Sequence, residues 1–339
     1  MRFPVVLLLF SVALAQVSTI PVTPASADEK NSAQQLVFVR QFASAQDLQR
    51  EHPILNRSLD IIAGAKAPEP SSPELQQPEA ITTDAGHRVF VTDAQARVVH
   101  VFDFTQSKYS QIRGGQLSWP VGVATDREDR IYVSDNGLRT VLIYDSRGKF
   151  LRPLKKLRGS ESYFDSVAGI AIDSTTNRIY VCDKLRHMVI AFDAKGRVLA
   201  QFGKRTAGDG PGEFRSPVRV IAAARQVIIL DSQNCRVQIF DPRARFINEF
   251  RVVDCGNGSG LAMDKDGSIY VSDPQLNRLE VYSHAGQFLY MFGEGGSAPG
   301  QFSGISGLWI DSGRCLYVAD EKNKRVQSFR IATAGPGGC

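Results

Sequence analysis

Six aspartates recur at regular intervals, each at the end of a short apolar phrase such as Ile-Tyr-Val-Ser-Asp. They are Asp93, Asp135, Asp183, Asp231, Asp273 and Asp320. A ring of carboxylates could hold a metal ion. Turn residues follow each aspartate, however, and there a carboxylate accepts backbone N–H bonds. Five aspartates are also followed, four or five positions later, by an arginine: Arg97, Arg139, Arg236, Arg278 and Arg325. We therefore interpret the aspartates as structural locks that pair with these arginines, and not as metal ligands.

The five histidines are a second source of chemistry, because zinc enzymes need about three imidazole or carboxylate ligands around one open position. They are His52, His87, His100, His187 and His284. None falls in a segment predicted to line a shared central site. The sequence therefore predicts neither a metal nor another cofactor, and it favours binding over catalysis.

The spacing of the aspartates defines a repeat. Successive members are 42, 48, 48, 42 and 47 residues apart, close to the roughly 40 to 45 residues of a four-stranded propeller blade. Within each unit, short apolar runs with a period of two alternate with turn residues, which is typical of consecutive antiparallel strands. The sequence thus predicts an all-β protein, a six-bladed β-propeller.

The sixth unit lacks a fourth strand, because the chain ends in a glycine-rich segment soon after residue 331. A strand from elsewhere must cover that edge. Residues 59–64, Leu-Asp-Ile-Ile-Ala-Gly, resemble the missing strand, so we expect this N-terminal strand to close the ring. The predicted domains are an N-terminal extension over 28–58, the propeller over 59–331 and a C-terminal tail over 332–339. Within the extension, residues 36–42 could form an additional strand.

The repeats resemble the NHL family, whose pattern runs Pro-x-Gly-Val-Ala-x-Asp, then a Tyr-Val-x-Asp strand, then Asn-His-Arg-Val-Gln-Val-Phe. Residues 234–240 read Asn-Cys-Arg-Val-Gln-Ile-Phe, and residues 323–329 read Asn-Lys-Arg-Val-Gln-Ser-Phe. The resemblance covers about residues 59–331 and implies a stand-alone NHL-type propeller; one fold of this kind serves scaffolds, receptors and enzymes alike. The fourth repeat departs from the pattern, with Arg219 in place of Gly and Ala223 in place of Asp.

One end of the predicted ring carries the candidate binding residues. Aromatic residues and arginine are frequent interface anchors, and the candidates on this loop face and around the channel mouth are Glu79, Trp119, Arg139, Arg186, His187, Arg219, Ser259 and Ser306. Arg219 is the strongest, because a cation beside the channel would face Glu79, Ser259 and Ser306. The alternative interpretation is that the arginines brace turns and Trp119 fills a gap between blades. We interpret Trp309, in the middle of an inner strand, as a core residue.

The N-terminus has the features of a signal peptide. Arg2 precedes an apolar run over residues 5–15, which is too short to span a bilayer. Cleavage sites with small residues end at Ala15 and Ala27; we favour the second, so residues 1–27 are the expected leader and the product is exported, either periplasmic or secreted.

Removing Arg2 lowers the net charge from +5 to +4. The dispersed basic residues and export argue against nucleic acid as a partner, and no later stretch suits a membrane span.

The five cysteines are an odd number for an exported protein. Cys235 and Cys255 both fall on the loop face of the fourth repeat, where they could form a disulfide or remain unpaired. Cys182 replaces a small strand residue and is expected to be buried. Cys339 is the candidate for a free or intermolecular thiol.

The leading hypothesis is an exported, non-catalytic propeller that presents its loop face or channel mouth to a protein, peptide or carbohydrate partner. A metal-dependent lyase or hydrolase on the same fold is the first alternative, and it requires at least two of Glu79, His187 and Arg219 near one bound ion or substrate. The second alternative is a structural subunit of an envelope assembly.

Overall fold

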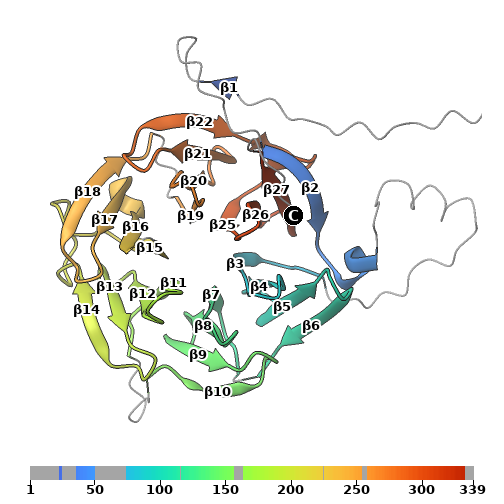
Figure 1. The fold of residues 1–339 in the computed structure, drawn as a ribbon, viewed down its shortest axis with the longest axis horizontal. Coiled ribbons are helices and arrows are strands. Elements are labelled where there is room, and N and C mark those ends of the chain that lie inside the picture. Colours follow the sequence, from blue (N-terminus) through green and yellow to red (C-terminus); the bar gives the residue numbers. More distant parts are fainter. Residues whose placement is uncertain are drawn as a thin grey trace, which may run out of the picture.

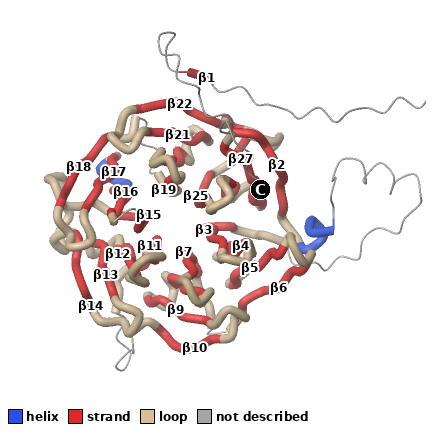
Figure 2. Tube along the Cα trace, viewed as in Figure 1, coloured by secondary structure: helices blue, strands red, loops and turns tan. Residues whose placement is uncertain are grey.

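The computed structural model describes residues 23–24, 36–49, 74–114, 116–155, 163–223, 225–253 and 258–332. The described strands form six radial sheets around a central axis (Figure 1). Turns and loops join the strands, and the described helical segments are two short 3-10 turns, η1 (Ala45–Gln49) and η2 (Ser232–Asn234) (Figure 2). The chain is therefore a six-bladed β-propeller, which confirms the fold predicted from the repeat.

The first three blades each contain four antiparallel strands, numbered from the axis outwards. Blade 1 consists of β3 (Pro78–Thr83), β4 (Val89–Asp93), β5 (Val98–Asp103) and β6 (Lys108–Ile112). Blade 2 consists of β7 (Pro120–Thr125), β8 (Ile131–Asp135), β9 (Thr140–Tyr144) and β10 (Phe150–Pro153). Blade 3 consists of β11 (Val167–Ile172), β12 (Ile179–Asp183), β13 (Met188–Phe192) and β14 (Val198–Phe202).

The remaining blades follow the same order, with additions at the edges. Blade 4 consists of β15 (Pro217–Ala223), β16 (Gln226–Asp231), β17 (Arg236–Phe240) and β18 (Phe246–Arg251). Blade 5 consists of β19 (Leu261–Met263), β20 (Ile269–Asp273), β21 (Arg278–Tyr282) and β22 (Phe288–Phe292), with β1 (Thr23–Pro24) on its outer edge. Blade 6 contains β25 (Ile305–Ile310), β26 (Cys315–Asp320) and β27 (Arg325–Ile331), and the connection from blade 5 forms a small parallel pair, β23 (Glu294–Gly295) and β24 (Gln301–Phe302).

The fourth strand of blade 6 comes from the N-terminal part of the chain. It is β2 (Leu36–Phe42), which pairs antiparallel with β27 from Leu36 opposite Ile331 to Phe42 opposite Val326. An N-terminal strand does close the ring, but the choice of residues 59–64 is wrong: they lie outside the described residues, and β2 occupies the edge predicted for them. The propeller therefore includes residues that the sequence assigned to the extension 28–58.

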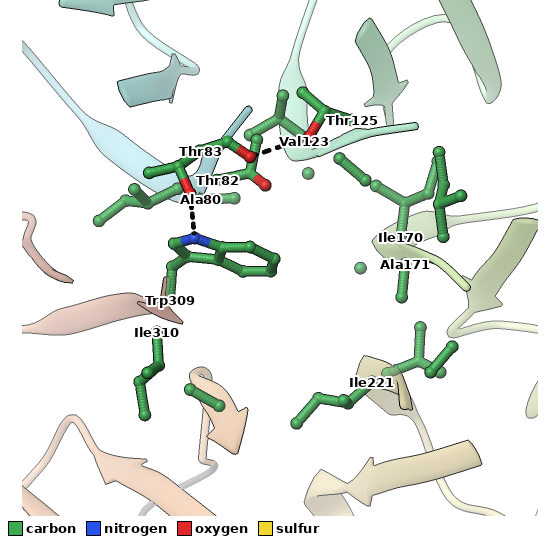
Figure 3. Close-up of a pocket in the computed structure, with 18 of the residues that line it drawn as sticks. Ala80, Thr82, Thr83, Val123, Thr125, Ile170, Ala171, Ile221, Trp309 and Ile310 are labelled. Carbon is green, nitrogen blue, oxygen red and sulfur yellow. Dashed lines mark hydrogen bonds between the residues drawn. The ribbon is translucent and has the colours of Figure 1, made fainter. Parts of the chain in front are cut away.

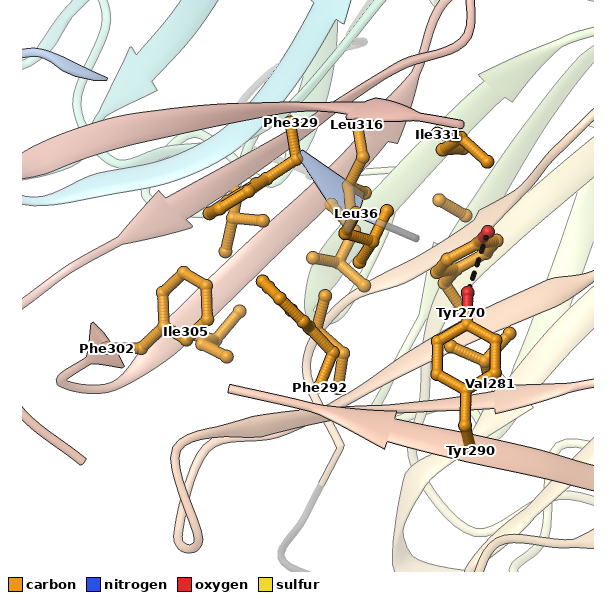
Figure 4. Close-up of a cluster of buried hydrophobic side chains, with 14 residues drawn as sticks. Leu36, Tyr270, Val281, Tyr290, Phe292, Phe302, Ile305, Leu316, Phe329 and Ile331 are labelled. Carbon is orange, nitrogen blue, oxygen red and sulfur yellow. Dashed lines mark hydrogen bonds between the residues drawn. The ribbon is translucent and has the colours of Figure 1, made fainter. Parts of the chain in front are cut away.

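The two ends of β2 explain why this segment closes the ring. Leu36 and Phe42 are each 1% exposed, and they lie in different apolar clusters. Leu36 packs between blades 5 and 6 beside Phe329 (Figure 4), whereas the ring of Phe42 lies 4.7 Å from that of Phe102 in blade 1. One strand thus joins two blade interfaces.

The hydrophobic core is divided among the blade interfaces. In the described part of the chain, buried apolar residues form six clusters, and each cluster draws on two neighbouring blades. Between blades 5 and 6, for example, Phe292 and Phe329 meet edge to face with ring centroids 5.1 Å apart (Figure 4). Such aromatic pairs add about 1 kcal/mol to the stabilisation from burial. Packing between blades, rather than within one blade, therefore holds the ring together.

In blades 1–4 and 6 the recurrent aspartates connect the entry of the blade to its second turn. Asp135, for example, accepts N–H bonds from Ser118 (2.7 Å) and Trp119 (3.0 Å) before β7 and from Leu138 (2.9 Å) after β8. The carboxylates of Asp93 and Asp183 accept the corresponding bonds in blades 1 and 3. In the structure these side chains fasten the connection between blades.

The pairing of these aspartates with arginine depends on the position of the arginine. Arg236 and Arg325, five residues after their aspartates, start a strand and reach the carboxylates at 3.0 and 2.8 Å. The pairing predicted for Arg97 and Arg139 is wrong. Both lie four residues after their aspartates, and their side chains are exposed. The backbone at this position is left-handed in every blade. The φ values for Arg97, Arg139, His187, Cys235, Asn277 and Lys324 are 57°, 50°, 52°, 55°, 55° and 53°. In blade 1 Nε2 of His100 lies 3.3 Å from the carboxylate of Asp93 instead.

Candidate functional site

At one level of the channel, five of the six blades carry a small residue near the start of the inner strand, and blade 4 carries Arg219. The equivalent positions are Ala80, Gly122, Gly169, Arg219, Gly260 and Gly307. Small residues are needed here because the neighbouring inner strands approach closely: a Cβ at Gly307 would lie 2.5 Å from the carbonyl oxygen of Glu79, and one at Gly169 would lie 2.6 Å from that of Val218. The ring therefore leaves space for a single long side chain, that of Arg219.

The side chain of Arg219 crosses the channel. Blade 4, which carries Arg219, lies opposite blade 1 in the ring (Figure 1). Its Nη2 donates to the carbonyl oxygens of Ser306 (2.9 Å) and Glu79 (3.3 Å), and Nη1 donates to that of Val218 (3.3 Å). Burial lowers the pKa of Arg219, while the charge of Glu79 acts in the opposite direction. These bonds to main-chain oxygens close the channel at the level of the ring.

Glu79 is the acidic residue nearest to this closure. Its Oε1 accepts a hydrogen bond from Nε2 of Gln77 at 3.2 Å, and the same nitrogen lies 3.0 Å from Oε1 of Glu321. Desolvation raises the pKa of Glu79 to about 7; Glu321 adds to the increase, whereas the positive charges of Arg219 and Lys184 oppose it. This carboxyl group therefore changes charge near neutral pH, beside a guanidinium group.

A cavity of about 630 Å³ occupies the channel between the Arg219 ring and the turns that follow the inner strands. Its walls are mostly apolar, with Val123, Ile170, Ile221, Trp309 and Ile310 around the axis (Figure 3). Threonines of β3 and β7 also line it, and charged residues and serines lie towards its two ends. The cavity extends to residues of the turns at 84–85, 126–127, 174 and 312, so its wide end lies on the face opposite to the predicted loop face.

Trp309 is the large wall residue that sequence reasoning assigned to the core. It packs partly against the cluster between blades 6 and 1, but it also lines the cavity, and its Nε1 donates to Oγ1 of Thr83 at 2.9 Å (Figure 3). A signal was present in the sequence: three blades have alanine at the equivalent position, residues 124, 171 and 262. A bulky residue among small ones on the inner strands indicates a side chain that narrows the channel.

Among the predicted mouth residues, the structure brings Arg219, Glu79 and Ser306 together. The hydroxyl groups of the two serines are already engaged between inner strands: Ser306 Oγ donates to the carbonyl oxygen of Pro78 at 2.6 Å, and Ser259 Oγ donates to that of Ile305. Neither serine, nor Glu79, is among the residues that line the cavity. The loop-face mouth and the cavity are thus separate spaces with Arg219 between them.

The other four predicted residues lie on the loops, away from Arg219. Trp119 is 43% exposed, and Arg139 is also exposed. Arg186 forms an ion pair with Asp165 at 2.9 Å, and Nδ1 of His187 accepts a bond from the backbone N–H of Ser216 at 3.2 Å. Arg186 therefore braces the connection before β11, as the alternative interpretation of the arginines has it, and His187 holds the residue before β15.

The cysteines divide into bonded and free groups. Cys235 and Cys315 are disulfide-bonded, whereas Cys182 is a buried free thiol whose pKa is raised by desolvation. Cys255 and Cys339 lie outside the described residues, so the pairing of Cys235 with Cys255 stays a prediction. In the same described ranges, no three His, Cys, Asp or Glu side chains gather closely enough to hold a metal ion, and no helix is long and apolar enough to cross a membrane.

Comparisons with known proteins support the architecture. A family model described as a 6-bladed beta-propeller matches residues 124–197. A structural genomics protein of unknown function from Bacteroides thetaiotaomicron is 16% identical and has a TM-score of 0.61, with 77% of this chain and 71% of that chain covered. A comparison with curated proteins gives no match.

Two lyases are also similar in structure. A streptogramin B lyase is 11% identical, has a TM-score of 0.59, and covers 76% of this chain and 94% of its own. A virginiamycin B lyase from Staphylococcus aureus is 10% identical, has a TM-score of 0.55, and covers 76% of this chain and 96% of its own. At these identities the similarity shows a shared six-bladed fold and nothing about activity.

Proposed function

We propose that this protein is an exported, non-catalytic binding propeller that takes an apolar group of its partner into the central channel. The observation that supports this proposal is the cavity of about 630 Å³, whose wall includes Trp309, Ile170, Ile221 and Ile310. Ligand pockets commonly measure 300–1,000 Å³ and combine apolar walls with a few polar groups. A peptide with apolar side chains or a small amphipathic molecule fits this description better than a carbohydrate.

Binding in the channel is tested with a neutral apolar fluorophore, N-phenyl-1-naphthylamine. In a Trp119→Phe background, Trp309 is the remaining tryptophan, so energy transfer from Trp309 reports occupancy of the channel. We expect saturable binding with one site per chain and its loss in Ile221→Lys, which places a charged side chain in the cavity. Leu199→Lys is the matched control, because Leu199 is 46% exposed on the outer strand of blade 3. Equal binding by the two lysine variants would contradict the proposal.

A second candidate function is acid–base catalysis at the loop-face mouth. The observation in its favour is Glu79, whose pKa of about 7 suits a general base, beside a guanidinium group that could stabilise an anion. A third similar structure, a catalytically inactive variant of the virginiamycin B lyase that is 10% identical with a TM-score of 0.55, was determined with quinupristin, which supplies a test compound. Incubation with quinupristin followed by mass spectrometry, with and without added divalent metal, tests this candidate. A product that forms in wild type and is lost in Glu79→Gln would support it; unchanged quinupristin would count against it for that substrate.

A further inference from the structure

We infer that the ligand of the central channel is an amphipathic carboxylate, whose apolar body lies against Trp309 and whose carboxylate binds Arg219 at the closed end. This inference rests on the proposed binding function and specifies its ligand class. It follows from the number of free donors on Arg219, from the distribution of charge along the cavity, and from the shape of the channel.

Arg219 retains donors for a further acceptor. A guanidinium group has five N–H donors, and its three hydrogen bonds within the described structure use two from Nη2 and one from Nη1. The two bonds of 3.3 Å are longer than an ordinary N–H···O bond. Arg219 also lines the cavity, so we place the anion on the two donors that remain, Nε and the second N–H of Nη1.

The charge along the cavity is asymmetric. Four charged residues line it: Asp84, Asp126, Arg127 and Arg219. Asp84 and Asp126 form ion pairs with the arginines of their own turns, at 2.6 and 2.7 Å, and Arg127 donates to carbonyl oxygens of the next blade's turn. All three lie at the wide end, so the closed end carries only the positive charge of Arg219.

A carboxylate from a ligand would supply the missing counter-charge. Arg219 is half-buried, and desolvating a cation without a paired anion is costly; charge-assisted bonds between arginine and carboxylate are among the strongest in proteins. Glu79, on the other side of the guanidinium, competes for this role only when ionised. Desolvation raises the pKa of Glu79, which weakens this competition, and the main-chain bonds of Arg219 leave donors for an external anion.

The shape of the channel selects the rest of the ligand. The walls from Arg219 to the turns are lined by isoleucine, valine and the Trp309 indole, and Trp309 is held by its bond to Thr83. Burial of apolar surface there contributes about 25 cal/mol per Å². An apolar chain with one terminal carboxylate matches the apolar walls and the cation at the closed end, whether it is a fatty acid or the C-terminus of an apolar peptide.

Matched ligands test the charge requirement. Octanoate and 1-octanol share the apolar chain and differ in the head group, and both can be titrated against Trp309 fluorescence in Trp119→Phe protein. We expect octanoate to bind at least tenfold more tightly than 1-octanol. In Arg219→Gln this preference should disappear through weaker octanoate binding, while 1-octanol affinity stays the same. Arg127→Gln, which removes a cation from the wide end, is the matched control and should keep the preference.

A second Arg219 variant and a pair of peptides complete the binding test. Arg219→Gly restores the residue of the repeat and serves as a second variant if the glutamine variant fails to fold. A short apolar peptide, as free acid and as C-terminal amide, distinguishes a peptide from a fatty acid as the source of the carboxylate. If neither octanoate nor 1-octanol binds, the binding function itself fails. If both bind with equal affinity, or the preference survives in both Arg219 variants, the channel binds ligands but the inference about Arg219 is wrong.

Discussion

Nη2 of Arg219 donates to the carbonyl oxygen of Ser306 at 2.9 Å, and this bond links the inner strand of blade 4 to that of blade 6 across the channel. The same nitrogen contacts the carbonyl oxygen of Glu79 in blade 1. Arg219, at a position that is glycine in four other blades, therefore lies across one end of the channel. It also places a cation beside a carboxyl group that titrates near neutral pH.

Replacing Arg219 should raise the pKa of Glu79 above its present value of about 7. The positive charge of Arg219 is the largest influence that lowers this pKa, so Arg219→Gln removes stabilisation of the ionised carboxylate. The carboxyl carbon of Glu79, observed by NMR in glutamate-labelled protein and assigned with Glu79→Gln, gives the titration directly. Lys184→Met is the comparison: Lys184 acts in the same direction with less effect, so its variant should show a smaller rise. A Glu79 pKa that stays the same or falls in Arg219→Gln would contradict the assignment.

Glu79 should also give the protein a pH-dependent stability. Its pKa is raised from 4.5 to about 7 on folding, so between these values the folded chain binds more protons than the unfolded chain. The free energy of unfolding must then fall as pH rises through this window, by about 3 kcal/mol at most. Glu79→Gln lacks this contribution. Urea unfolding of both proteins at pH 5 and pH 8 should show wild type losing stability relative to the variant, whereas parallel profiles would exclude an elevated pKa.

The fold can be predicted from the sequence where it depends on local pattern. The repeated aspartates mark the ends of the second strands in all six blades because each carboxylate fixes the turn that follows it. The closing strand could not be chosen in the same way. Pairing along the outer edge of β27 is decided by where Leu36 and Phe42 pack, and those contacts involve blades far apart in the sequence.

For the site, the sequence identified Arg219 because it departs from the repeat, and the structure places it beside Glu79 and Ser306. The channel wall was not predicted, since a period of two does not show which inner-strand residues face the axis; Trp309 was assigned to the core for this reason. Counting positions also failed for Arg97 and Arg139, because a left-handed backbone turns these side chains away from the aspartates.

Arg236→Met should destabilise blade 4 strongly. Arg236 is 6% exposed, pairs with Asp231 at 3.0 Å and Glu249 at 2.9 Å, and donates to carbonyl oxygens of the connection from blade 3. Its removal leaves the fully buried Asp231 without its cation, which typically costs about 3–5 kcal/mol. The urea midpoint measures this loss. Arg139→Met is the control, and because Arg139 is exposed, its effect should remain within about 0.5 kcal/mol; similar losses in both variants would contradict the role given to Arg236.

Phe42→Ala should weaken the closure of the ring. Phe42 is 1% exposed at the end of β2, with its ring 4.7 Å from that of Phe102 and 5.0 Å from that of Phe104 in blade 1. Truncating a buried phenylalanine costs about 3–5 kcal/mol, and here the loss falls on the strand that joins the N-terminal part of the chain to blade 6. Hydrogen exchange should therefore accelerate first in β2 and β27, which share the pairing from Leu36 to Phe42.

Phe246→Ala, on the outer strand of blade 4 where the side chain is 38% exposed, should cost about 1 kcal/mol or less and leave exchange in β27 unchanged. If Phe42→Ala were as mild as Phe246→Ala, β2 would be an accessory strand and the ring would be held closed by the interface between blades 1 and 6 alone.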